Sequence, residues 1–517
     1  MSLVGRIERT GDAAVRLIRN GWFIALAVGL FLTWIVLLDP GADPDMFARV
    51  AVGRIVERDG SVAAADPFAY TTTHERWVDH EWLAGVAMWQ LAKAGGDRAL
   101  LGLAILGVFG CVFLTAAAQR RYAGRAAGAV AWLALCLLPL PWVWMSVVRS
   151  RALTYVLLPL FLLILVEYRR KKAPALLLVL PPLMVIWANW HGGFVMGLGF
   201  LGLTALGALR DGLRFAAPLL LAAAACALVT LVNPYGLEYW SYLRDALTMD
   251  RSTHIGEWGP LWGQPRLLAW VAMVAVAWLL SLARRFRTRE REVPPEAVLL
   301  PAVSLAFAVD SNRLAAAFLV TVAVFGADSL EPLARRVARF AQAVPVAWRR
   351  SLALVGVPSL LALGIPAASV ALGRGGPALR YDMYPVHALE WLRESRPGGN
   401  VLVRFDLGSY ALWRLHPRFR VSLDGRYEEV YPQSTFDDVK RAFAPGADGH
   451  EEAFARVRPD FIVLSNDHEA ASRPRMFGEE WAVVYRDEAF TILAEARGNV
   501  VPATGPEEVR PTWEPLF

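Results

Sequence analysis

The chain has 517 residues, 56% of them hydrophobic and only 19% charged, and its 53 basic and 47 acidic residues give a net charge of +6. Soluble domains carry about 25% charged residues, whereas the apolar residues here form repeated blocks that approach the ~20 residues needed to cross a bilayer. A small soluble domain, a disordered chain and a disulfide scaffold are therefore excluded. The excess of basic residues lies in short clusters between the apolar blocks, where it reports membrane topology rather than nucleic-acid binding.

About eleven apolar segments are predicted to be membrane-spanning helices, so the fold class is an α-helical polytopic membrane protein. In chain order they cover residues 22–38, 99–118, 126–145, 152–168, 173–188, 194–209, 215–232, 267–283, 296–309, 314–327 and 352–372. The first segment is interpreted as a retained helix, because no cleavage site for a signal peptide follows it. The three cysteines fall inside apolar segments and are interpreted as small buried hydrophobic residues.

The basic clusters predict the orientation of the chain in the membrane. With about eleven spans, every dense cluster falls on the side of the N-terminus, which is cytoplasmic by the positive-inside rule. The later clusters are Arg120/Arg121/Arg125, Arg169 to Lys172, Arg210/Arg214, Arg284 to Arg291 and Arg335 to Arg350. Residues 296–327 are counted as two short spans, because a single span would place Asp310 and Arg313 in mid-membrane. The C-terminal region is then expected to face outward.

The long loop 39–98 after the first span is predicted to contain two surface helices. Residues 46–59 have apolar residues at helical spacing, as expected for an amphipathic helix on the membrane surface. A second helix at about 79–94 has Trp82 and Trp89 as interfacial anchors. A turn is expected between the two helices.

The chain is predicted to divide into a transmembrane domain (1–378), an extracytoplasmic α/β domain (379–495) and a loose tail (496–517). The α/β domain is indicated by candidate helices and strands that alternate along the chain. Helices are expected at 386–395, 435–443 and 450–456, strands at 400–405, 419–423 and 460–464, and a hairpin at 481–494.

Asp43 and Asp45 form a carboxylate pair at the outer end of the first span. Such a pair binds a divalent cation such as Mg²⁺ or Mn²⁺, or acts as a general base towards an acceptor hydroxyl. The alternative is that both residues terminate a helix and are solvated. Their position close to the membrane plane, with other acids in the outward loops, favours the catalytic hypothesis.

Three arginines on the outward side are candidate phosphate ligands. Arg149 and Arg151 lie where the positive-inside rule disfavours arginine, and a guanidinium group binds phosphate in a bidentate manner. The alternative for this pair is snorkelling towards lipid headgroups. Arg313, beside Asp310, is a similar candidate, with an internal ion pair as its alternative.

Other polar residues are expected on the same side of the membrane. The candidate substrate-binding residues in the outward loops are Asp66, His80, Glu81 and Glu257. Turns and helix starts are the alternatives for the first three. The segment 189–193 adds Asn189 and His191, and the histidine can donate to phosphate or accept a proton. A tight turn with an interfacial tryptophan is the alternative there.

A chain of many spans, whose first outward loop opens with paired acids and contains two surface helices, resembles the GT-C superfamily of membrane glycosyltransferases. That superfamily includes protein O-mannosyltransferases, lipid A aminoarabinose transferases and the catalytic subunits of oligosaccharyltransferases. More closely, the chain resembles a group of poorly characterised bacterial membrane proteins. The matching segments are Asp43-Pro44-Asp45, Asp66-Pro67-Phe68, His80-Glu81-Trp82-Leu83, Asn189-Trp190-His191-Gly192, Asn233-Pro234-Tyr235-Gly236 and Asp424-Gly425-Arg426.

The resemblance implies an inverting transfer of a sugar from a polyprenyl-phosphate donor to an acceptor, at the outer face of a bacterial cytoplasmic membrane. It assigns the role of base or metal ligand to Asp43 or Asp45. The implied partners are the lipid-linked donor, membrane lipids and an acceptor that is a glycan, a lipid or a protein. The alternative is a non-catalytic or transport component of a cell-surface polysaccharide pathway. A transport route needs polar residues along the spans, whereas these spans are nearly free of Asp, Glu and Lys.

Overall fold

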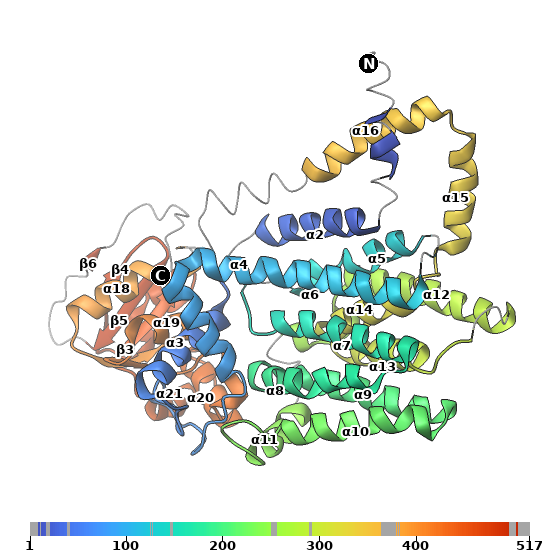
Figure 1. The fold of residues 1–517 in the computed structure, drawn as a ribbon. Helices are drawn as coiled ribbons and strands as arrows, with labels where there is room; N and C mark the ends of the chain where they lie inside the picture. The colour runs from blue at the N-terminus through green and yellow to red at the C-terminus, as the bar shows by residue number, and fades with distance from the viewer. Residues whose placement is uncertain are drawn as a thin grey trace.

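The computed structural model describes residues 9–10, 12–16, 21–38, 42–124, 126, 128–144, 148–249, 256–288, 292–362, 379, 381, 383–495 and 503–504. It consists of a bundle of helices and a mixed α/β region that lies against one end of the bundle (Figure 1). Residues 363–372 of the last predicted span lie outside the described residues, as does nearly all of the predicted tail, 496–517.

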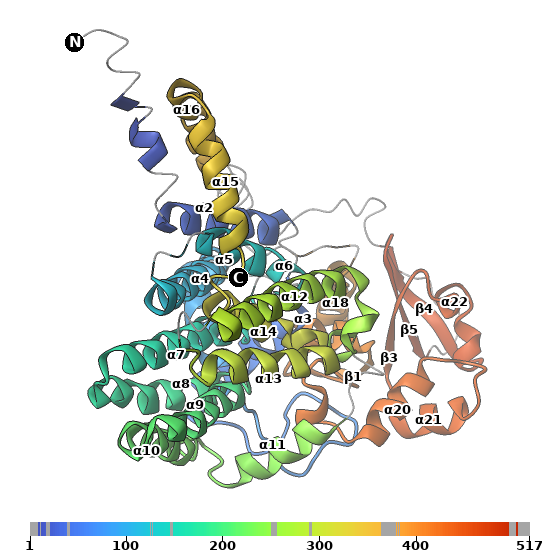
Figure 2. The same cartoon turned by 90° about the vertical axis from the view of Figure 1, so that its right-hand side faces the viewer.

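The bundle is formed by helices that lie side by side and run in similar directions (Figures 1 and 2). They are α2 (Gly21–Leu38), α4 (Trp82–Ala123), α5 (Ala129–Leu137), α6 (Leu140–Trp144), α7 (Ala152–Lys171), α8 (Leu180–Trp190), α9 (Phe194–Ala208), α10 (Leu213–Val229), α12 (Pro265–Thr288), α13 (Glu296–Asp310) and α14 (Ala315–Phe325). Each of the first ten predicted spans overlaps at least one of these helices. Their buried side chains form one apolar core, in which Trp132, Phe161 and Trp187 are fully enclosed.

Within the described residues, four helical segments are long and apolar enough to cross a membrane: α4, α7, Phe194–Asp211 and α12. The prediction of about eleven spans is therefore not confirmed. The reason is length, because several predicted spans are short helices. With its 17 residues, α10 is about 26 Å long, less than the ~30 Å of a hydrocarbon core.

Residues 296–327 form two helices, as the charged residues between them indicate. α13 and α14 pack against each other and are joined by a short 3-10 turn, Asn312–Leu314. The Asn312 side-chain amide donates to the backbone oxygens of Gly256 (3.1 Å) and Gly259 (2.9 Å). This turn is thereby fixed beside the loop that carries Glu257.

The α/β region contains a mixed six-stranded sheet with the order β2-β1-β3-β5-β4-β6. β1 pairs in parallel with β2 and β3, and β5 pairs in antiparallel fashion with β3 and β4. The strands are β1 (Gly399–Leu402), β2 (Phe419–Val421), β3 (Phe461–Ser465), β4 (Trp481–Arg486), β5 (Phe490–Glu495) and β6 (Ala503–Thr504). The helices of this region are α18 (Val386–Ser395), α19 (Phe405–Leu415), α20 (Gln433–Ala442), α21 (His450–Val457) and α22 (Glu469–Ser472).

The helices and strands expected between residues 386 and 494 are confirmed, with boundaries shifted by at most three residues. The sequence pattern does not predict α19, which begins where the strand 400–405 was expected to end. The apolar run that continues from β1 into α19 explains this difference, because a short apolar run does not distinguish a strand from a buried helix.

The first loop is not a pair of surface helices, so that prediction is wrong. α3 (Pro44–Asp59) is enclosed between α4 and α19, and the ring of Phe47 lies 5.0 Å from that of Tyr410. Burial of apolar side chains on both sides, rather than on one, holds this helix inside the protein. The second expected helix is the first part of α4, which changes direction at Gly95 and Gly96.

The first loop also extends the sheet. Ala69 pairs with Val421 of β2, and the two segments exchange backbone hydrogen bonds on either side of this pair. α3 and the α/β region share one hydrophobic core. The division of the chain at residue 378 stays a prediction, but the shared core makes loop 42–81 a structural part of the C-terminal region.

The crossing of α3 and α4 depends on glycine. A Cβ atom placed on Gly85 would lie 2.7 Å from the backbone oxygen of Arg49, whereas one on Gly102, also in α4, would meet no atom within 4 Å. We expect Gly85→Ala to lower the free energy of unfolding by about 1–3 kcal/mol, because overpacking forces the backbones apart.

Gly102→Ala is the matched control, and it should be neutral or stabilising by up to about 1 kcal/mol, because alanine favours a helix interior over glycine. Denaturant unfolding of the detergent-solubilised protein measures both changes. Equal stability of the two variants would contradict the close approach of α3 and α4.

Candidate active site

A cavity of about 500 Å³ opens where the bundle meets the α/β region. One end of it is lined by charged side chains from α3, from the loops before α4, α7 and α14, and from residues 425–429 of the α/β region. The other end is an apolar groove between α9, α13 and α11 (Glu238–Thr248). The groove residues include Met196, Gly199, Leu203, Leu247, Val303 and Phe307. The cavity thus has a charged end and an apolar end.

Arg149 lies at the centre of the first ionic cluster. Its Nε is 3.0 Å from Asp43, its Nη2 contacts Asp45, and its Nη1 is 3.2 Å from Glu257. Arg151 binds Glu257 at 2.7 Å, and Arg313 approaches the same carboxylate at 3.7 Å. We call these six residues the Arg149 cluster. It joins the start of α3 to three loops of the bundle.

The two aspartates of the predicted pair have different environments. Asp43 is buried and caps α3, because its carboxylate accepts a hydrogen bond from the backbone N–H of Asp45 (2.9 Å). Asp45 lines the cavity, and 37% of its side chain is exposed. Enclosure by the cavity and the neighbouring charges of Asp43 and Glu257 raise the pKa of Asp45 to about 6, although Arg149 opposes the shift. A carboxylate of this kind accepts a proton readily near neutral pH.

Arg49 lies at the centre of the second ionic cluster. It contacts Asp79 and Glu429 at 2.6 Å and Glu81 at 2.8 Å. We call these residues, with His80, the Arg49 cluster. Burial alone would raise the pKa of Glu81, but Arg49 together with the neighbouring His80, His191 and Ser150 outweighs burial and lowers that pKa to about 2. Because Glu429 belongs to the α/β region, the charged end of the cavity is built from both parts of the chain.

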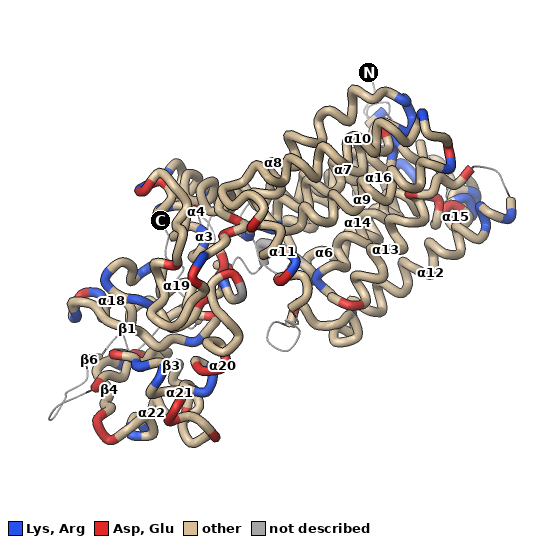
Figure 3. Tube along the Cα trace, turned by 90° about the horizontal axis from the view of Figure 1, so that it is seen from below, with Lys and Arg blue, Asp and Glu red and all other residues tan. Residues whose placement is uncertain are grey.

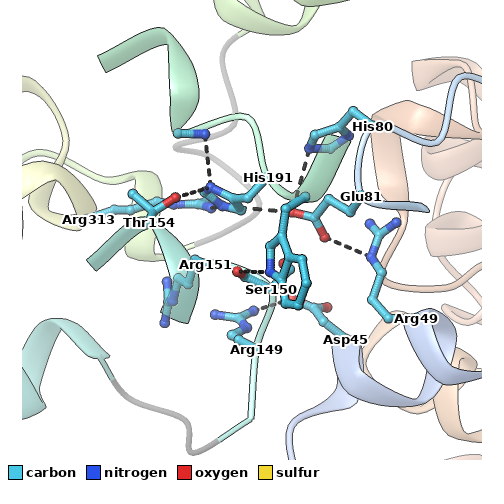
Figure 4. Close-up of polar contacts among 12 residues, drawn as sticks. Asp45, Arg49, His80, Glu81, Arg149, Ser150, Arg151, Thr154, His191 and Arg313 are labelled. Atoms are coloured by element: carbon cyan, nitrogen blue, oxygen red, sulfur yellow. Dashed lines mark hydrogen bonds and ion pairs between the residues drawn. The ribbon is translucent and has the colours of Figure 1, made fainter. Parts of the chain in front are cut away.

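Two histidines face the same oxygen of Glu81 (Figure 4). The Nε2 atoms of His80 and His191 lie 3.6 and 3.7 Å from Glu81 Oε1. Burial would lower the pKa of His80, but Glu429, 3.2 Å from its Nδ1, outweighs this effect and the pKa is raised. Burial lowers the pKa of His191 to about 3. At neutral pH His191 is therefore neutral, whereas its neighbour His80 has a raised pKa.

The tautomer of His191 follows from its hydrogen bonds. The backbone N–H of Gly193 donates to Nδ1 (2.9 Å), so Nδ1 carries no proton. Thr154 Oγ1, which accepts from Trp187 Nε1, is also 2.9 Å from Nδ1. The proton of the neutral ring is therefore on Nε2, which faces the cavity. His191 is placed to donate a hydrogen bond there, and not to accept a proton.

Arg313 is held less tightly than Arg149. Its guanidinium stacks over the ring of Trp258 at 4.5 Å, and its contact with Glu257 is long, at 3.7 Å. Its Nη2 lies 3.5 Å from His191 Nε2, which in this tautomer carries a proton and accepts no hydrogen bond from the arginine. Trp258 orients the guanidinium without using its N–H donors. Arg313 and His191 thus point donors at the same part of the cavity (Figure 4).

Two predicted site residues have structural roles elsewhere. Asp66 forms a buried ion pair with Arg426 (2.5 Å) and accepts hydrogen bonds from the backbone of the turn that follows it. Asn189 accepts from Trp82 Nε1 and donates to the backbone oxygens of Val185 and Val232. Because protein groups satisfy these side chains, we assign both to the framework that supports the cavity.

Sequence reasoning missed Arg49 and Glu429. Arg49 lies in the segment 46–59, which was expected to form an amphipathic surface helix and carried no sign of a buried arginine. Glu429 carried no signal of its own, since its partners Arg49 and His80 are more than 340 positions away in the chain. The neighbouring segment Asp424-Gly425-Arg426, which the resemblance had singled out, was the nearest available pointer to this wall of the cavity.

The expected metal ligands, Asp43 and Asp45, do not fit a divalent cation in this arrangement. The Arg149 guanidinium contacts both carboxylates and would have to be displaced by the ion. Among the described residues, no group of three or more His, Cys, Asp or Glu side chains is arranged to hold a metal ion. We therefore derive no step through a metal.

The fold of the chain is similar to those of two solved proteins, an oligosaccharyltransferase and ArnT. It is similar to the archaeal oligosaccharyltransferase AglB from Archaeoglobus fulgidus, solved with an inhibitory peptide and a dolichol-phosphate, with a TM-score of 0.55 and 13% identity over 88% of this chain and 70% of that one. It is also similar to ArnT from Cupriavidus metallidurans in the apo state, with a TM-score of 0.51 and 17% identity over 92% and 98% of the two chains. No protein-family model and no curated protein sequence matches the chain.

The Arg149 cluster makes a prediction about stability. Arg149→Met leaves the buried Asp43 and its neighbour Asp45 without their cation, so we expect the free energy of unfolding to fall by about 3–5 kcal/mol. Adding Asp43→Asn to this variant should restore part of the loss, because one of the uncompensated charges is then gone.

The control is Arg404→Met, which breaks a pair with Asp406 whose side chains are about half exposed. That change should cost at most about 1 kcal/mol. Denaturant unfolding in detergent gives the three values. If Arg149→Met costs no more than Arg404→Met, Arg149 does not compensate the acids.

Proposed function

We propose that the protein transfers a sugar from a polyprenyl-phosphate-linked donor to an acceptor hydroxyl. The observation that carries the proposal is the shape of the cavity, in which an apolar groove leads into a charged end. A lipid phosphate has the same division into an apolar chain and a charged head. The fold shared with membrane glycosyltransferases supports the same class of reaction.

In this proposal the lipid chain of the donor lies in the groove along α9. The phosphate meets Arg313, Arg151 and the Nε2–H of His191, which all line the cavity. Arginine suits phosphate because its planar fork binds two oxygens at once. A neutral histidine adds a directed donor whose state does not depend on pH near neutrality. Arg149, already shared among three carboxylates, is assigned to charge compensation rather than to the phosphate.

Asp45 is the proposed general base. It takes the proton from the acceptor hydroxyl, whose oxygen forms a bond to the anomeric carbon of the sugar. The bond from that carbon to the phosphate oxygen breaks on the opposite side, and polyprenyl phosphate leaves with the electron pair. The configuration at carbon is thereby inverted. The raised pKa of Asp45 supports this role, since a base works best when its pKa lies near the working pH.

The cavity lies at the end of the bundle opposite to the ends of α7 and α12, where Lys and Arg residues gather (Figure 3). Arg169 and Arg170 of α7 and Arg285 of α12 line one crevice there. By the positive-inside rule this arrangement supports a cavity at the outer face of a bacterial cytoplasmic membrane. A transport component of a polysaccharide pathway remains the second candidate. In the described residues, the charged groups gather at the two ends of the bundle rather than following a path through it, which favours transfer.

Asp45→Asn should lower the transfer rate by about 10²–10⁴-fold, because asparagine keeps the size of the side chain but cannot take the proton. The wild-type rate should fall as the pH drops through about 6, where Asp45 becomes protonated. Transfer from a polyprenyl-phosphate sugar by the purified protein measures both effects.

Asp43→Asn is the matched control, because asparagine is also a good N-cap residue and keeps the hydrogen bond to residue 45. It should retain most of the activity. If the two variants lose activity equally, or if Asp45→Asn is fully active, Asp45 is not the base.

The groove gives a second prediction. A Cβ atom on Gly199 or on Gly202 of α9 would meet no atom within 4 Å, but of the two only Gly199 lines the cavity. Gly199→Phe should fill the groove and weaken binding of a polyprenyl phosphate by at least about tenfold, whereas Gly202→Phe should bind as the wild type does.

Both variants place the same side chain on the same helix, so their folding is directly comparable. Binding is followed by intrinsic tryptophan fluorescence in detergent micelles. Equal affinities would show that the lipid chain lies elsewhere.

A further inference from the structure

α15 (Glu331–Ala343) has an exposed apolar face that the proposed transfer reaction does not use. Leu333, Val337 and Phe340 follow one another at intervals of four and three residues, so they lie on one side of the helix. Their side chains are 57%, 57% and 76% exposed. Three large apolar residues that are aligned and exposed in this way indicate a surface that a membrane or another protein covers.

Arginines cover the opposite side of α15 and flank its apolar face. Arg335 and Arg339 lie on the opposite side, whereas Arg336, three residues after Leu333 and four before Phe340, lies at the edge of the apolar face. All three are exposed, and Arg335 is 2.6 Å from Glu331 one turn earlier. A helix with an apolar stripe and arginines on its other side is typical of helices that lie in the interface of a membrane. Its charge is complementary to anionic lipid headgroups.

The direction of α15 fits the same role. It runs crosswise to the bundle helices, at the end of the bundle where α12 finishes (Figure 1). Lys and Arg residues gather at this end (Figure 3). Because the bundle helices cross the bilayer, a helix that runs across their ends lies along the membrane surface. The pair between Glu331 and Arg284 of α12, at 3.3 Å, fixes the start of α15 to the bundle.

We propose that α15 is a membrane-surface helix that binds anionic phospholipids of the bilayer in which the bundle sits. Leu333, Val337 and Phe340 enter the boundary of the acyl chains, and the three arginines bind the headgroup phosphates. A second copy of the chain is a poorer occupant, because a facing α15 would bring two sets of arginines together. The binding surface is at the opposite end of the bundle from the cavity and does not depend on the proposed transfer.

The test places a fluorescent probe on either side of the helix in the full-length protein. Phe340→Cys lies on the apolar face, and Gln342→Cys, an exposed position about half a turn away, is the matched control. The three native cysteines are buried, and wild-type protein treated with the same reagent gives the background. The labelled proteins are placed in nanodiscs of phosphatidylglycerol or of phosphatidylcholine, with and without a lipid that carries a nitroxide quencher at the top of its acyl chain.

We expect the nitroxide lipid to quench the probe at position 340 at least about threefold more than the probe at 342. Replacing phosphatidylglycerol by phosphatidylcholine should reduce the quenching at 340, and so should the triple change of Arg335, Arg336 and Arg339 to Gln. Equal quenching at the two positions would overturn the membrane placement. Quenching at 340 that is the same in both lipids would overturn the recognition of anionic headgroups. Protection of the 340 probe that appears only when two copies share a disc would make the occupant a second chain.

Discussion

This structure depends on one constraint. The charged side chains enclosed where the helix bundle meets the α/β region must be paired with opposite charges. The Arg149 and Arg49 clusters together place six carboxylates within contact of four guanidinium groups. An enclosed carboxylate costs several kcal/mol unless a cation and hydrogen bonds accompany it. The partners come from α3, from loops of the bundle and from residue 429 of the α/β region. These segments must therefore assemble together, and the shared core of α3 and the sheet provides the apolar contact that brings them into place.

The carboxylates and arginines are not all paired to the same extent, and the side chains that line the cavity therefore differ in pKa and in how tightly they are held. Glu81 and Glu257 are held by several cations and keep low pKa values, whereas Asp45 faces the cavity beside other acids and has a raised one. Arg149 is saturated by three acids, while Arg313 is oriented by stacking on Trp258 and makes long polar contacts. In the proposed function, one set of charges therefore provides both the base and the place for the donor phosphate. His191 adds a neutral donor because Gly193 fixes its tautomer.

Much of the fold follows from the sequence, and the site follows only in part. The apolar segments of the sequence locate the helices of the bundle, because burial and helix length leave a strong pattern. Counting these segments overestimates the number of membrane-spanning helices, because helices such as α10 are short. Chain order alone brings Asp45, Arg149 and His191 to one end of the bundle. It does not reveal that Arg49 is buried, because the spacing of residues in α3 is the same whether a helix lies on a surface or inside a core. Pairing of Arg49 with Glu429 is a tertiary contact over 380 positions, which no local pattern encodes.

The proposed site is tested most directly by a structure of the protein in a nanodisc with a polyprenyl-phosphate-linked sugar bound. The account predicts that the lipid chain lies beside Gly199, that the phosphate is within hydrogen-bonding distance of Arg313 and of His191 Nε2, and that the Asp45 carboxylate faces the anomeric centre. A donor phosphate bound away from these residues, for example in the crevice between α7 and α12 at the basic end of the bundle, would contradict it.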